Sequence, residues 1–213
     1  MVSRIPFSVY DFFGYLASGF LLLATLDYAF DGGWVLNKDI GIVFGVFWVG
    51  VAYIAGHIIA NVSSYLLEKK LVRRVLVSPE ETLFQAKKTT GWARIFPNFY
   101  EPFPEKLQQR ILIKAKEKAD IDEPGRALFL HCHSIVKRDE ATQARLNSFL
   151  NLYGFSRNIS MAATLAFIVF LADILFGTIR DNEWVWLLAA MVAAVGMLYR
   201  YLKFFKHYTR RFL

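Results

Sequence analysis

The stretch GVAYIAGHIIANVSSYLLE, residues 50–68, is long and apolar enough to cross a bilayer, and it also carries regularly spaced polar side chains. These side chains recur at intervals of four, three and four residues, which predicts that they share one face of an α-helix. This polar row consists of His57, Asn61, Ser64 and Glu68. Because a polar side chain is costly against lipid, we expect the row to contact other helices.

Beside the polar row, Ala52, Gly56 and Ala60 have the small-xxx-small spacing that lets two helix backbones approach closely. Two interpretations of the polar row remain open. Either His57 is neutral and hydrogen-bonds a neighbouring helix, or the row takes part in ion conduction, proton handling or gating. Asp11 is a candidate member of the same site, because its position in the first apolar stretch allows it to face the row.

The composition is that of a membrane protein: 55% of the 213 residues are hydrophobic, 20% are charged and the net charge is +7. The single cysteine, Cys132, excludes an intrachain disulfide and a cysteine-rich metal site, and we expect no metal or other cofactor. The apolar stretch after Arg4 contains Asp11 and lacks a small-residue cleavage motif, so we expect it to be retained as the first span.

The predicted fold is all-α, with four transmembrane helices arranged as two hairpins and a helical cytoplasmic domain inserted between spans two and three. The spans are expected at residues 7–30, 40–67, 159–177 and 184–201. The predicted divisions are a first transmembrane hairpin at 1–67, a cytoplasmic helical domain at 68–156, a second hairpin at 157–203 and a basic juxtamembrane tail at 204–213.

Within the cytoplasmic domain, helix-start signals predict four helices. Ser78-Pro79 begins one that runs to about Lys88, Pro104 begins the next, and Asp122-Glu123-Pro124 precedes the third. The fourth starts near Asp139 and leads towards span three, with a break expected at Gly154.

The basic residues predict the orientation. Twenty-three of the 25 Lys and Arg residues lie on one side of the proposed membrane, and only Lys38 and Arg180 lie on the other. The positive-inside rule then predicts a multi-pass membrane protein with both termini and the segment between spans two and three in the cytoplasm. The basic tail is expected to bind the anionic inner leaflet through Lys203, Lys206, Arg210 and Arg211.

Asp27 and Asp173 lie at similar depth near the outer ends of spans one and three. Two interpretations remain open. In an assembly of several copies the two carboxylates would ring an outer vestibule, as in many cation pathways, and otherwise they are solvated among the headgroups.

Two short patterns invite an enzymatic interpretation. Arg126 and His131 have the R-x4-H spacing found in the HEPN family of helical ribonucleases, a resemblance that implies RNA cleavage, but an alanine follows the arginine where that family usually has a polar residue. His131-Cys132-His133 cannot close on one metal ion without further ligands from elsewhere, because consecutive helical residues point about 100° apart. We expect neither enzymatic activity nor a nucleic-acid partner.

The segments YDFFGYLASGF, GHIIANVSSYLLEK and YGFSRNIS together resemble small four-span membrane proteins of prokaryotic antiphage loci, such as membrane accessory proteins of type VI CRISPR systems. This resemblance implies a homo-oligomeric inner-membrane effector that forms a pore or perturbs the bilayer under the control of its cytoplasmic domain. The alternative is a non-conducting anchor or sensor that docks a cytosolic protein partner.

Overall fold

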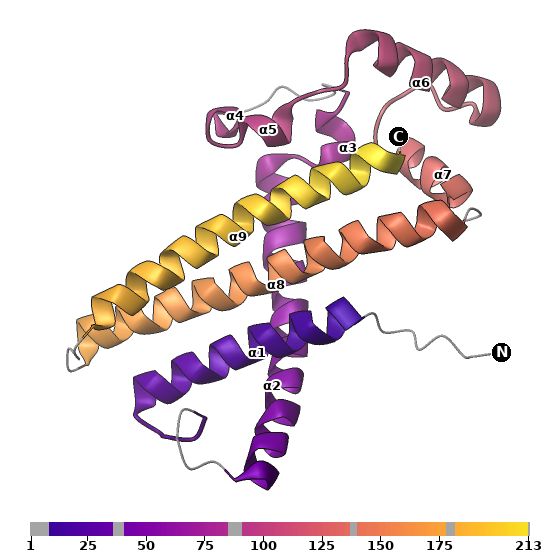
Figure 1. The fold of residues 1–213 in the computed structure, drawn as a ribbon. Coiled ribbons are helices and arrows are strands. Elements are labelled where there is room, and N and C mark those ends of the chain that lie inside the picture. The colour runs from indigo at the N-terminus through magenta and orange to yellow at the C-terminus, as the bar shows by residue number, and fades with distance from the viewer. Residues whose placement is uncertain (1–8, 36–40, 85–90, 137–139, 178–181, 213) are drawn as a thin grey trace, which may run out of the picture. The chain divides into compact units, whose positions relative to one another are not determined.

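The computed structural model describes residues 9–35, 41–84, 91–136, 140–177 and 182–212, and Figure 1 shows the fold. These residues form helices and connecting loops without any strand, as the all-α prediction requires. Four helices among them are long and apolar enough to cross a membrane, which agrees with the number of spans predicted. They are the helices within Phe12–Phe30, Ile42–Thr82, Leu146–Phe176 and Glu183–Arg211.

The chain divides into two compact units, Met1–Leu67 with Gly154–Tyr201 and Glu68–Tyr153 with Leu202–Leu213. Both predicted hairpins, 1–67 and 157–203, fall mainly in the first of these units, and the predicted domain 68–156 and tail 204–213 fall mainly in the second. The helices are α1 (Val9–Phe30), α2 (Ile42–Ser63), the π-helix η1 (Ser64–Leu76), α3 (Pro79–Thr82), α4 (Trp92–Ile95), α5 (Pro97–Tyr100), α6 (Glu105–Ala119), α7 (Arg126–Val136), α8 (Glu140–Phe176) and α9 (Glu183–Phe212).

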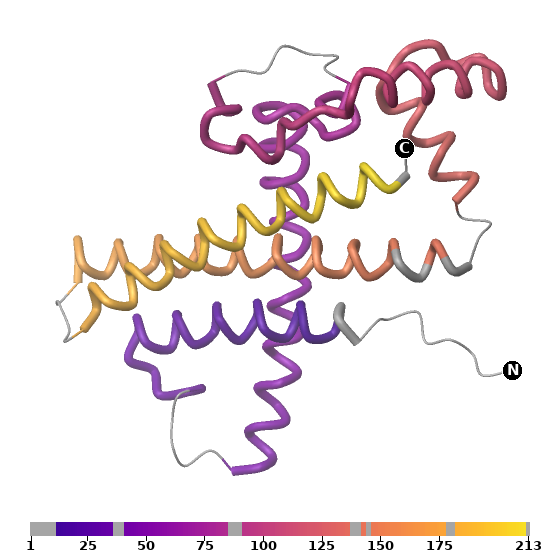
Figure 2. Tube along the Cα trace, turned by 45° about the horizontal axis from the view of Figure 1, so that its top comes forward, coloured from indigo at the N-terminus to yellow at the C-terminus, as the bar shows by residue number. Residues whose placement is uncertain are grey.

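In the first unit, α2 crosses α1 at a very close backbone contact. A Cβ atom added to Gly19 would overlap the carbonyl of Ala52, and one added to Gly56 would overlap the carbonyl of Tyr15. The predicted close packing of the row Ala52, Gly56 and Ala60 is therefore confirmed, since all three are buried. In both views α2 crosses α1 instead of lying alongside it (Figures 1 and 2).

The helices α1, α8 and α9 of this unit run parallel or antiparallel to one another. Gly14 lies against Phe155 and Tyr28 contacts Phe170, so α1 and α8 run in the same direction. The Ser160 hydroxyl donates to the Ala194 carbonyl at 2.9 Å, while Ala166 and Phe170 pack with Leu187 and Ala190 farther along, so α9 runs antiparallel to α8. Figure 2 shows α8 and α9 side by side in this unit.

The second unit has its own apolar core. Leu83, Phe84, Phe103, Ala115 and Leu128 are buried together, and the Phe103 amide donates to the Leu83 carbonyl at 2.9 Å. Ala115 and Leu128 lie in this core because apolar residues on one face of each helix gather where the helices meet.

Two predicted boundaries are corrected. α8 continues through Gly154 without a break, because one glycine costs an α-helix only about 1 kcal/mol and its neighbours are well packed. The helix that begins after Ser78 ends at Thr82, and the rest of the predicted segment, to Lys88, lies partly outside the described residues.

The glycine contact gives a test of the crossing. Gly56→Ala should lower the free energy of unfolding by about 3 kcal/mol, because its methyl group would overlap the α1 backbone. Gly50→Ala is the matched control on the same helix, since its Cβ meets nothing within 4 Å and alanine favours a helix by up to about 1 kcal/mol. Thermal melting of the two variants in detergent measures the difference, and equal melting temperatures would contradict the close crossing.

Candidate functional site

His57 is held between two tyrosines of the first unit. Its ring stacks on Tyr15 with centroids 4.1 Å apart and meets Tyr53 edge-on at 4.6 Å. Such aromatic contacts fix the orientation of the ring and stabilise the α1–α2 crossing. In the single chain His57 therefore acts in helix packing, and its participation in gating stays a prediction.

The polar row does not form a single surface. Asn61 is exposed, Ser64 is half-buried, and Glu68 belongs to the second unit. Sequence reasoning assumed α-helical spacing throughout, but η1 begins at Ser64, and a π-helix has more residues per turn, so side chains four apart no longer stack. Within the single chain Asn61 faces outward, and its contact with helices of other copies stays a prediction.

Glu68 is fixed by two partners of the second unit. Its carboxylate accepts a hydrogen bond from the Tyr153 hydroxyl at 2.5 Å and forms an ion pair with Arg73 at 3.4 Å. Since both oxygens have a partner, this carboxylate anchors η1 to the first part of α8.

The buried polar site that sequence reasoning missed is centred on Ser63, the neighbour of the polar row. The Ser63 hydroxyl lies 2.9 Å from both the Asn158 Oδ1 and the Ala60 carbonyl, to one of which it donates at a time, and it accepts from the Arg157 Nε at 3.1 Å. Asn158 is only 3% exposed. The only sequence signal was the polar SRNIS segment, and nothing in the sequence pairs it with a serine 95 positions away.

The acidic candidates have different surroundings. The side chain of Asp11 lies outside the described part of the chain. Asp27 is 2% exposed, and its carboxylate accepts from the amides of Trp34 at 2.6 Å and Val35 at 3.0 Å, so it caps the loop after α1 and is not solvated. Asp173 is half-buried near the end of α8. A vestibule formed by several copies stays a prediction.

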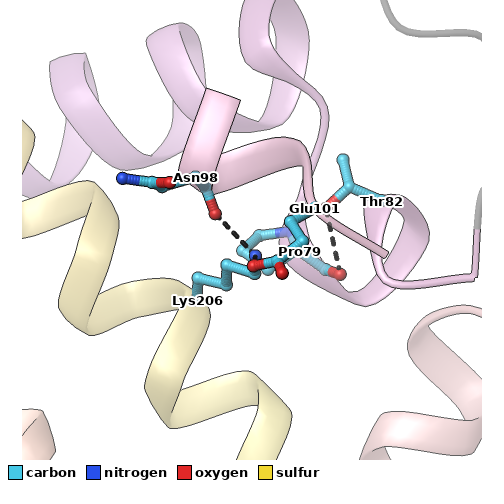
Figure 3. Close-up of polar contacts among 5 residues, drawn as sticks. All are labelled: Pro79, Thr82, Asn98, Glu101 and Lys206. Carbon is cyan, nitrogen blue, oxygen red and sulfur yellow. Dashed lines mark hydrogen bonds and ion pairs between the residues drawn. The ribbon is translucent and has the colours of Figure 1, made fainter. Parts of the chain in front are cut away.

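The C-terminal part of α9 packs into the second unit, with Lys206 at the centre. Its ammonium group donates to the Asn98 carbonyl at 2.5 Å and pairs with the Glu101 carboxylate at 3.2 Å, as Figure 3 shows. Lys206 is only 5% exposed, and a buried ammonium group needs such partners. The Lys206 ammonium also holds the pKa of Glu101 below its usual value through their hydrogen bond and charge attraction.

The rest of the predicted tail is helical and partly engaged. Arg210 lies over the Phe103 ring at 5.5 Å and Arg211 over the Phe149 ring at 4.5 Å, while Lys203 is exposed. The expectation that Lys206 binds lipid is corrected, because its ammonium group is turned into the protein. Lipid binding by the other three cations stays a prediction.

The residues with an enzymatic interpretation lie on α7. Arg126 is exposed at the first position of the helix, and His131 is half-buried. Cys132 packs against the core of the second unit, where burial raises the pKa of its thiol. No group of three or more potential metal ligands occurs among the described residues.

Comparison of the chain with protein-family models, curated proteins and solved structures gives no match.

The Ser63 site can be tested by removing one hydroxyl. Ser63→Ala should lower the free energy of unfolding by about 1–3 kcal/mol, because buried polar partners on α8 lose a hydrogen bond. Ser64→Ala, next in the chain and half-buried, is the control and should change the free energy by less than about 0.5 kcal/mol. Chemical unfolding in detergent measures the free energy of both variants. Equal losses would contradict a stabilising contribution from the Ser63 hydrogen bonds.

The Lys206–Glu101 pair predicts a dependence on pH. Because the folded-state pKa of Glu101 is lowered, its charge contributes stability above its unfolded pKa, about 4.3, and that contribution is lost as the pH falls through the folded value. Glu101→Gln should therefore melt at a lower temperature than the wild type at pH 7, and the difference should shrink below about pH 4. Glu117→Gln, at an exposed position on α6, is the control, and a difference that does not change with pH would contradict the pair.

Proposed function

We propose that this protein is an oligomeric effector of the bacterial inner membrane that forms a pore or perturbs the bilayer under the control of its second unit. The second unit would lie in the cytoplasm together with both termini. Its role in prokaryotic antiphage defence is inferred from the resemblance of its three segments to small four-span membrane proteins of defence loci.

The directions of α1, α8 and α9 support three of the four proposed crossings. α1 and α8 run in the same direction, as the contacts of Gly14 with Phe155 and of Tyr28 with Phe170 indicate. If both cross the membrane from the cytoplasm, the chain must return between them, and α2 is apolar and long enough for that crossing. α9 then brings the chain back to the cytoplasm a second time.

The observation that carries the proposed control is the length of α9. This helix runs without a break for 30 residues from Glu183 to Phe212, so the candidate fourth span and the segment around Lys206 are one helix. Within the second unit, Lys206 is fixed to Asn98 and Glu101. A signal that displaces these partners would act directly on the helix that crosses the membrane.

Assembly is supported by the exposed face of α2. Ile54, Ile58 and Asn61 are all exposed, and an asparagine at such a position stabilises helix association through interhelical hydrogen bonds. Ser63 and Asn158, both buried in the first unit, are paired with each other within the chain, so we place a polar pathway between several copies.

A non-conducting anchor or sensor is the second candidate, and the surface of α6 favours it. Five basic side chains of this helix are exposed, and they would attract a cytosolic partner with an acidic surface. They are Lys106, Arg110, Lys114, Lys116 and Lys118. The enclosure of His57 by two tyrosines also agrees with a purely structural first unit.

Ion flux from proteoliposomes tests the two candidates. For the pore, Asn61→Ala should reduce flux at least tenfold and lower the oligomer mass, because the polar contact between copies is lost. Ile58→Ala, one turn earlier on the same exposed face, should retain both properties. If the protein is an anchor, the wild type should conduct no ions. Replacing the α6 cations with glutamate should then abolish capture of the cytosolic partner, while Asn61→Ala should leave that capture unchanged.

A further inference from the structure

Three helices of the first unit enclose an apolar cavity of about 410 Å³. Each helix contributes side chains from one face, at spacings of three and four residues. The lining residues are Leu21, Ala24, Thr25 and Tyr28 of α1, Ala163, Ala166 and Phe170 of α8, and Trp186, Ala189, Ala190 and Ala193 of α9. Ala163 and Ala166 are buried at its floor, whereas Trp186 and Ala189 are exposed at its rim, so the cavity opens to the surroundings of the unit.

The lining excludes water as a stable occupant. A buried water needs two to four polar partners, and the walls are mainly alanine, leucine and aromatic side chains. The Thr25 hydroxyl is already bonded, because it donates to the Leu21 carbonyl at 2.7 Å. An apolar occupant would instead recover the dispersion contacts that the wall atoms lack.

The lining of the cavity is short along each helix. On each wall it extends over eight residues, a rise of about 10 Å. A flexible hydrocarbon chain is thin enough to enter between α1 and α9 and lie on the alanines of α8.

The position of the cavity identifies the source of the hydrocarbon. All of its lining belongs to three of the four helices that are apolar and long enough to cross a membrane. In α1 and α8 the lining lies towards the C-terminal ends, Phe30 and Phe176, and in α9 it lies towards the N-terminal end, Glu183. The three walls therefore lie at a similar depth along the candidate spans. We propose that this cavity binds one acyl chain of a membrane phospholipid and that the bound chain completes the packing of α1, α8 and α9.

The test is to fill the cavity with a side chain. Ala193→Phe places a ring where the acyl chain would lie, while Val192→Phe makes a similar enlargement at an exposed position outside the lining. Each full-length variant is reconstituted in vesicles of palmitoyl-oleoyl phosphatidylglycerol, extracted in mild detergent and analysed by native mass spectrometry. We expect the wild type and Val192→Phe to retain one more phospholipid per chain than Ala193→Phe.

Circular dichroism and melting on the same samples check the fold, and Ala189→Phe at the exposed rim replaces Ala193→Phe if the latter does not fold. Equal phospholipid retention by a folded filling variant and the wild type would overturn the proposal. A change in oligomer mass without a change in lipid number would also overturn it, because a side chain from a second copy would then occupy the cavity.

Discussion

Close approach between helix backbones is the constraint on which the first unit depends. In a bilayer the lipid tails are as apolar as leucine, so helices are held by packing and hydrogen bonds. At the α1–α2 crossing, Gly19 and Gly56 leave no room for a methyl group. The α8–α9 contact likewise uses small residues, with Ala166 packed near Ala190. Between α1, α8 and α9 many side chains are also small, but no further helix fills the space, so a cavity remains.

Several buried polar side chains are satisfied by partners within the chain. Asp27 accepts hydrogen bonds from backbone amides of the loop that follows its own helix, and Ser63 joins α2 to α8 through Asn158. Lys206 is buried only because the Asn98 carbonyl and the Glu101 carboxylate receive its ammonium group. A polar group away from water is costly when it lacks a hydrogen-bond partner, so these contacts determine which helix surfaces pack together.

The division into two units falls within long helices, and this gives the proposed control a physical basis. α8 and α9 each contain residues of both units, and η1 follows α2 without a break. A helix transmits displacement along its axis because its backbone hydrogen bonds keep it stiff. The Lys206 contacts belong to the unit that would receive a signal, and the apolar first part of the same α9, residues 183–201, belongs to the other.

The sequence by itself determined the helical class, four helices capable of crossing a membrane and the small-residue row of α2. These follow from composition and from periodicity along one helix, which are local properties. Only the tertiary structure decided that Asn61 is exposed, that Ser63 is paired with Asn158 and that Lys206 is buried against Glu101. The partners in these pairs are about a hundred positions apart, and their contact depends on how the helices cross, which helical periodicity does not encode.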